Sequence, residues 1–130
     1  MADKTPAERL RLKAGMTAAL LHLPEGMGEL LGVPDGVAPA DDPAAAEFVL
    51  DVAITQAEAE RRLSALEPHV RDKTILWIGY PKGSKAAGHD LNRDTVATFA
   101  RTIGLVAIAN VAIDDTWSAL RVRRLQPGDR

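Results

Sequence analysis

The sequence predicts an α/β fold, a three-layer sandwich with helices on both faces of a mostly parallel sheet of four to five strands, closed by a C-terminal antiparallel hairpin. Two observations predict it. Short runs of aliphatic residues alternate with stretches of helical periodicity, which is typical of parallel sheets. The last two apolar runs are separated only by residues 114–116, a spacing that predicts a hairpin. One antiparallel strand is common in such sheets.

The first half of the chain contains two predicted strands and one helix. An apolar run at residues 16–23 ends at Pro24 and predicts a buried strand. Residues 25–31 predict a short helix, and the loop at 32–43 includes a small strand at 37–38. Residues 48–54 form the second strand.

A helix follows the second strand, and its start and end are both marked in the sequence. Thr55 and Glu58 fit a capping box. Pro68 sets the helix end near Glu67. The periodicity directs one face inward and the other to water, the inner set being Leu63, Leu66 and Val70 and the outer set Glu60, Arg61 and Arg62.

The second half of the chain repeats the pattern. Residues 74–80 predict a third strand, residues 93–103 a helix with Asn92 as N-cap and Gly104 after its end, and residues 105–113 a fourth strand. Residues 117–125 return as a fifth strand, which we expect to be antiparallel and at an edge of the sheet. Charged side chains on an edge strand disfavour pairing with another chain, and this strand would present Arg121, Arg123 and Arg124.

The composition is that of one globular domain, with 46% hydrophobic and 26% charged residues in 130. We expect a polar, loosely docked arm at residues 1–13, a single α/β domain at 14–125 and a tail at 126–130. The absence of cysteine excludes disulfides and thiolate chemistry. No apolar run is long enough for a membrane span, and the arm lacks the apolar core of a signal peptide. We therefore expect a cytoplasmic protein.

Three motifs resemble those of a family of short, single-domain bacterial proteins of unknown function, found mainly in high-GC bacteria. They are Tyr-Pro-Lys-Gly-Ser at residues 80–84, Leu-Asn-Arg-Asp at 91–94 and Trp-Ser-x-Leu-Arg at 117–121. The resemblance covers residues 14–125. It implies a compact single domain and singles out these three segments, but it brings no activity.

The loop after the third strand is the strongest candidate for a binding site. Residues 83–90 have the glycine spacing of a phosphate-binding P-loop, but His89 and Asp90 stand where that motif needs Lys and Ser or Thr. Basic side chains, glycine N–H groups and a helix N-terminus still predict a site for a phosphate or carboxylate. The predicted contacts are Lys82, Gly83, Ser84, Lys85, His89, Asn92 and Arg93. The alternative is an ordinary solvated loop.

Four further residues would share the same rim. Ligands of open α/β sheets bind outside the carboxyl ends of the strands. Those ends supply His22, Asp51, Tyr80 and Asn110. His22 beside Asp51 would be the acid–base pair of an enzyme without a cofactor, which is one alternative function. Such a pair requires the two side chains within hydrogen-bond reach, directly or through one water.

The remaining observations restrict the partners. The three histidines lack the spacing of a zinc site, so we expect neither metal nor cofactor. Residues 61–130 are mildly basic and aromatic residues make up 4% of the chain, which does not favour nucleic acid. A further alternative is a non-catalytic interaction domain that uses the C-terminal hairpin, with Trp117 and Arg121 contacting a second copy or another protein.

Overall fold

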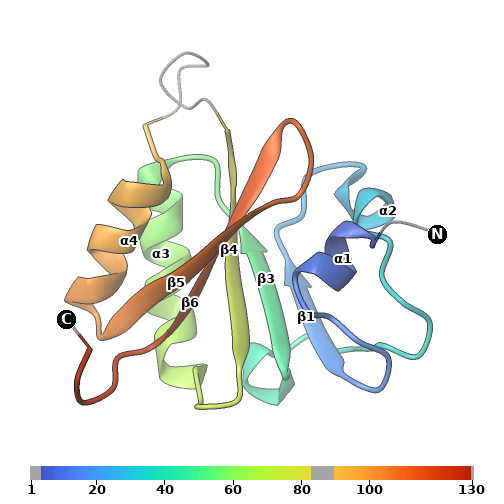
Figure 1. Cartoon of the computed structure of the whole chain (residues 1–130), viewed down its shortest axis with the longest axis horizontal. Coiled ribbons are helices and arrows are strands. Elements are labelled where there is room, and N and C mark those ends of the chain that lie inside the picture. Colours follow the sequence, from blue (N-terminus) through green and yellow to red (C-terminus); the bar gives the residue numbers. More distant parts are fainter. Residues whose placement is uncertain (1–3, 83–89, 130) are drawn as a thin grey trace.

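A six-stranded mixed sheet forms the centre of the molecule (Figure 1). The computed structural model describes residues 4–82 and 90–129. The strands lie in the order β2-β1-β3-β4-β6-β5. They span Thr17–Leu21 (β1), Ala38–Pro39 (β2), Phe48–Val52 (β3), Ile75–Pro81 (β4), Leu105–Ala112 (β5) and Trp117–Arg124 (β6). The first four pair in parallel, whereas β6 runs antiparallel to both β4 and β5.

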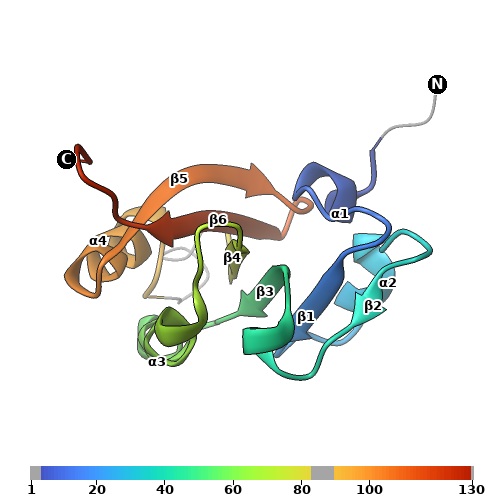
Figure 2. The same cartoon turned by 90° about the horizontal axis from the view of Figure 1, so that it is seen from below.

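Helices cover both faces of this sheet, which confirms the predicted three-layer α/β class (Figure 2). The helices are α1 (Pro6–Arg9), α2 (Met27–Leu31), α3 (Gln56–Leu66) and α4 (Arg93–Thr102), with short 3₁₀ turns η1 (Pro43–Ala45) and η2 (Glu67–His69). The α3 and α4 pair packs on one face, and α1 and α2 pack on the other. Within the described ranges, no helix has the length and apolarity needed to cross a membrane.

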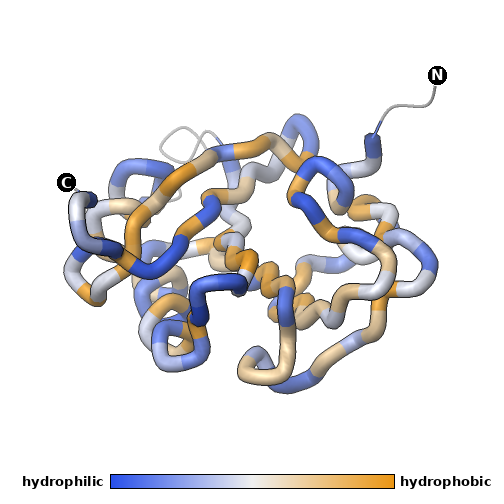
Figure 3. Tube along the Cα trace, turned by 60° about the horizontal axis from the view of Figure 1, so that its bottom comes forward, coloured by the Kyte–Doolittle hydropathy of each residue, from blue (hydrophilic) through white to orange (hydrophobic). Residues whose placement is uncertain are grey.

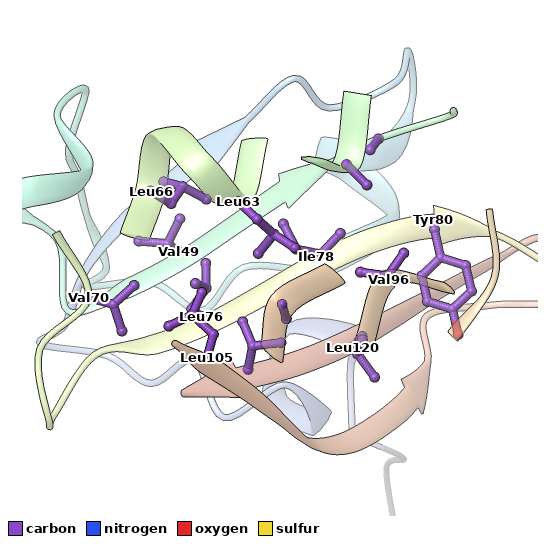
Figure 4. Close-up of a cluster of buried hydrophobic side chains, with 14 of the residues drawn as sticks. Val49, Leu63, Leu66, Val70, Leu76, Ile78, Tyr80, Val96, Leu105 and Leu120 are labelled. Atoms are coloured by element: carbon purple, nitrogen blue, oxygen red, sulfur yellow. The ribbon is translucent and has the colours of Figure 1, made fainter. Parts of the chain in front are cut away.

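The larger core lies between the sheet and the α3–α4 layer (Figure 4). Alternate side chains of the strands point into it, as the period of two in a strand requires. Leu76 and Ile78 of β4 meet Leu63 of α3 and Val96 of α4 there, and all four are fully buried. Each such side chain contributes about 1.5–3 kcal/mol on burial, so this layer anchors both long helices.

The second core shows that the expected loosely docked arm is wrong for residues 4–13. Leu10 and Leu12 are buried to 0% and 1% exposure against the opposite face of the sheet. The indole N–H of Trp77 donates to the carbonyl of Leu10 at 2.9 Å. The buried residues Ala7, Leu10 and Leu12 therefore dock this segment on the sheet, although charged residues surround them.

The position of β6 corrects a second expectation. This strand is antiparallel as predicted, but it lies between β4 and β5 and is not an edge. Its arginines therefore do not protect an exposed edge of the sheet from pairing with another chain. The edge strand on this side of the sheet is β5, which carries no charged residue and has a bulge between Ala107 and Ala109, where Ile108 is 42% exposed. Hydrophobic stretches run through the middle of the fold, and many of the polar stretches lie toward its outside (Figure 3).

The helix ends follow the sequence closely. The Asn92 side chain accepts hydrogen bonds from the N–H groups of Asp94 and Thr95, which confirms it as N-cap of α4. Gly104 has φ +85°, the left-handed conformation expected after a helix. Thr55 caps α3 as predicted, but Glu58 accepts from the N–H of Ile54 rather than that of Thr55, so the reciprocal half of the capping box is absent.

Candidate functional site

Two polar clusters lie near the carboxyl ends of the parallel strands, on the face covered by α3 and α4. The His22 cluster consists of His22, Asp51 and Arg62. The Lys82 cluster consists of Tyr80, Lys82, Asn92, Arg93, Asp94, Asn110 and Ser118, which together line one depression. The predicted rim residues thus divide between two places, with two of them in each cluster.

The His22 cluster is built on neighbouring parallel strands. Leu21 of β1 pairs with Asp51 of β3, so His22 immediately follows a residue that lies beside Asp51. The Nδ1 atom of His22 is 2.7 Å from Oδ1 of Asp51. His22 has φ +55°, a left-handed conformation that few non-glycine residues adopt. The turn after β1 therefore holds the imidazole against the carboxylate, well within the reach that acid–base chemistry requires.

Arg62 completes this cluster, contrary to the prediction that it faces water. Its Nε lies 3.3 Å from Oδ1 of Asp51 and donates to the carbonyl of Val52. The side chain of Asp51 is only 3% exposed. Burial raises the pKa of Asp51, while the hydrogen bond from His22 and the charges of His22 and Arg62 oppose that shift. The two partners thus offset part of the desolvation of a buried carboxyl group.

A groove of about 990 Å³ runs from the His22 cluster along α3. Its lining comes mainly from α3 and the ends of β1 and β3, with Pro43 of η1, His69 of η2 and Phe99 of α4. Its apolar lining residues include Leu21, Ala57, Ala65 and Leu66. The Nδ1 atom of His22 is engaged by Asp51, and its side chain is 53% exposed. A carboxylate that orients a histidine while leaving Nε2 accessible is the arrangement of a general acid or base.

The Lys82 cluster surrounds a depression of about 280 Å³ at the carboxyl end of β4. Lys82 follows the strand, and its backbone N–H donates to the carbonyl of Thr116 at 2.8 Å, which fixes the chain as it leaves the sheet. Arg93 stands at the start of α4. Asn110 of β5 and Ser118 of β6 contribute from the adjacent strands.

Hydrogen bonds within this cluster engage several of its polar groups. The Tyr80 hydroxyl donates to Oδ1 of Asn110 at 2.7 Å. Burial raises the pKa of Tyr80, so its hydroxyl stays protonated at neutral pH. The side-chain oxygen of Asn92 is used as the N-cap. The Nε atom of Arg93 lies 3.6 Å from Oδ1 of Asp94, and both side chains are exposed. Lys82 and Arg93 are the cationic residues that line this depression, and Arg93 is paired with the carboxylate of Asp94.

The structure brings the predicted residues together only in part. Gly83, Ser84, Lys85 and His89 lie outside the described residues. Sequence reasoning missed Arg62 and Ser118. A signal for Arg62 existed, because it shares a helical stripe with the buried residues Ala59, Leu63 and Leu66. Across residues 4–82 and 90–129, no three His, Asp or Glu side chains group as metal ligands.

The proposed interaction residues do not form one exposed surface. Trp117 is half-buried and packs against the core on the α1 side. Arg121 is half-buried in the middle of β6, where it pairs with Trp77 of β4 and Ala109 of β5. An interaction through these two residues remains a prediction.

Several solved structures have a similar fold, and a number of them are described as methyltransferases. The tRNA methyltransferase TrmK of B. subtilis matches with a TM-score of 0.55 and 10% identity, over 97% of this chain and 68% of that one. A variant of MtNAS in complex with S-adenosylmethionine matches with a TM-score of 0.58 and 15% identity, over 92% and 59%. A protein of Sulfolobus solfataricus described as a type 11 methyltransferase has a TM-score of 0.55 and 10% identity, over 95% and 91%.

The structural likeness shows the fold alone at these identities. No protein-family model matches the chain, and no curated protein matches its sequence. The comparison therefore establishes a shared overall fold and nothing about a shared activity.

Proposed function

We propose that this protein binds a small ligand bearing a phosphate or carboxylate at the Lys82 cluster. The observation that carries the proposal is the convergence of Lys82, Arg93 and the N-terminus of the ten-residue helix α4 on one depression. Two cations and a helix N-terminus favour a negative charge. The solved neighbours support a small-molecule site in general, since one was determined with S-adenosylmethionine.

The polar lining refines the ligand chemistry. Asp94 lines the same depression and is an acceptor, as is the carbonyl group of Asn110. A ligand with hydroxyl or amino donors beside its anionic group matches this lining better than a simple anion. S-adenosylmethionine, which combines a carboxylate with an amine and hydroxyl groups, belongs in the first set of compounds to be tested, together with sugar phosphates and nucleotides.

The test is a thermal-shift and calorimetry screen with wild-type protein. A ligand of this site raises Tm, and the double replacement Lys82→Gln and Arg93→Gln removes the shift without lowering Tm of the free protein. Arg61→Gln serves as control, because Arg61 is an exposed arginine on α3 away from the cluster. An equal loss of binding in the control, or no shift with any anionic compound, refutes the proposal.

A second candidate function is acid–base catalysis by His22. The favouring observation is the 2.7 Å contact between Nδ1 of His22 and the buried carboxylate of Asp51, at the head of a largely apolar groove. A substrate with an apolar body along α3 would present its reacting group to Nε2. Chromogenic ester hydrolysis provides the assay, with His22→Gln expected to abolish turnover and Asp51→Asn to reduce it. Equal rates in wild type and His22→Gln exclude this function.

A further inference from the structure

A cationic cavity lies on the opposite face of the sheet, beside α1. It has a volume of about 460 Å³. Its lining consists of Lys4, Glu8, Arg9, Arg11, Lys13 and Val111. Four of these six residues carry a positive charge and one carries a negative charge. Neither cluster described above contributes to it.

Two of the charged side chains form hydrogen bonds with backbone groups around the cavity. The guanidinium group of Arg9 donates to the carbonyls of Ala112 and Ile113 at 3.1 and 2.9 Å, which holds α1 against the end of β5. The carboxylate of Glu8 accepts from the backbone N–H of Thr5 at 2.8 Å and completes the capping box of α1. Lys4, Arg11 and Lys13 form no ion pair with any described residue.

Arg11 is held in an unfavourable conformation at this cavity. It has φ +73°, in the left-handed region that favours glycine. The turn that follows α1 imposes this conformation, since the N–H groups of Arg11 and Leu12 both bond back to carbonyls of the helix. A left-handed residue at this place is a common way to end a helix, so the conformation of Arg11 belongs to the end of α1.

A second arginine, Arg121 of β6, has an unpartnered polar atom. The Nε atom of Arg121 is buried and has no hydrogen-bond partner among residues 4–82 and 90–129. Burial, and then the charge of Arg11, lower the pKa of Arg121, so the two guanidinium groups repel each other. Both arginines stay charged at neutral pH because an arginine pKa is far above 7. An anion bound in the cavity beside Arg11 would offset this repulsion.

We propose that the α1 cavity binds a phosphate-bearing small molecule with at least two negative charges. Arg11, Lys13 and Lys4 would contact its phosphate oxygens, with Arg121 adding charge from the adjoining strand. Guanidinium groups match phosphate geometry through paired hydrogen bonds, and several cations around one cavity favour a multiply charged anion over a single carboxylate. The proposal does not depend on the ligand of the Lys82 cluster.

Inorganic pyrophosphate is the probe, and two variants separate binding from folding. Arg11→Gly removes a cation and fits the left-handed backbone, and Arg121→Leu removes the unpartnered guanidinium. We expect each to bind pyrophosphate about tenfold more weakly in calorimetry, as loss of a charge-assisted hydrogen bond implies. Neither variant should lower Tm of the free protein. Arg61→Gln, which removes one positive charge on α3, should leave the affinity unchanged.

Several results overturn the proposal. These are no binding of pyrophosphate by wild type, an equal loss of affinity in Arg61→Gln, or a loss in Lys82→Gln alone, which would assign the anion to the other site. Binding of a short RNA without binding of pyrophosphate also overturns it. Changes in backbone NMR chemical shifts on addition of pyrophosphate that are confined to the segment around Arg11 and to β6 support it.

Discussion

Replacement of Leu10 by alanine tests how firmly the segment before β1 is docked. Leu10 is 0% exposed and packs in the core shared by α1, α2 and the sheet. Its backbone carbonyl accepts the hydrogen bond from Trp77, and the replacement leaves that bond in place. The effect on stability therefore reports side-chain packing and the cavity left behind.

The expected loss of unfolding free energy is about 3 kcal/mol, within the 2–5 kcal/mol that large-to-small core replacements produce. A protein of this size has a total stability of about 5–15 kcal/mol, so Tm should fall by about 10 °C. Urea denaturation followed by tryptophan fluorescence measures the change. Trp77 is 1% exposed, so its emission reports unfolding of this core directly.

Leu30→Ala is the matched control. Leu30 lies in α2 and is 38% exposed, so the same chemical change should alter stability by no more than about 0.5 kcal/mol. If Leu10→Ala and Leu30→Ala lose the same amount, the segment is only loosely docked and the argument from burial is wrong.

Three other predictions test the sheet, the His22 cluster and the C-terminal segment. Gly79→Ala should destabilise the protein by about 1–3 kcal/mol in urea titrations, because the added Cβ would lie 3.0 Å from Cγ2 of Val52 in a packed sheet. Burial raises the pKa of Asp51 above 3.8, so the folded protein retains this proton at higher pH than the unfolded chain. Its contribution to stability is present below pH 3.8 and lost as pH rises through the raised pKa, and Asp51→Asn should abolish that part of the pH profile of the urea midpoint. The carboxyl group of Asp129 should titrate in NMR with a pKa of about 2, set by its hydrogen bonds from Arg123, and Arg123→Gln should return the pKa toward 3.8.

Local sequence patterns predicted the elements well, because each pattern reflects a local requirement. Thr55 and Asn92 begin helices where their side chains cap free N–H groups, and Gly104 ends one where the backbone turns left-handed. The order of strands is a different matter. No local pattern in β6 predicts that it inserts between β4 and β5, since the place of a strand in the sheet depends on pairing between distant segments.

The candidate sites show the same division. The neighbouring parallel strands that join His22 to Asp51 were predictable once both strands were recognised. Arg62 was expected on the outer helix face with Glu60 and Arg61, although its position lies in the stripe of the buried Ala59, Leu63 and Leu66. The cavity at Arg11 had no sequence signal, because its strained backbone and its closeness to Arg121 exist only in the folded chain.

The central place of β6 has a consequence for how the protein is made. When β1 to β5 have left the ribosome, β4 still lacks its antiparallel neighbour, and β5 has nothing to pair with. The sheet becomes continuous only after residues 117–124 emerge and enter between strands that already exist. The tertiary structure is therefore completed late. A nascent chain stalled before Trp117 exposes the edges of β4 and β5 that β6 pairs with in the finished sheet, and chaperones or other nascent chains can bind there.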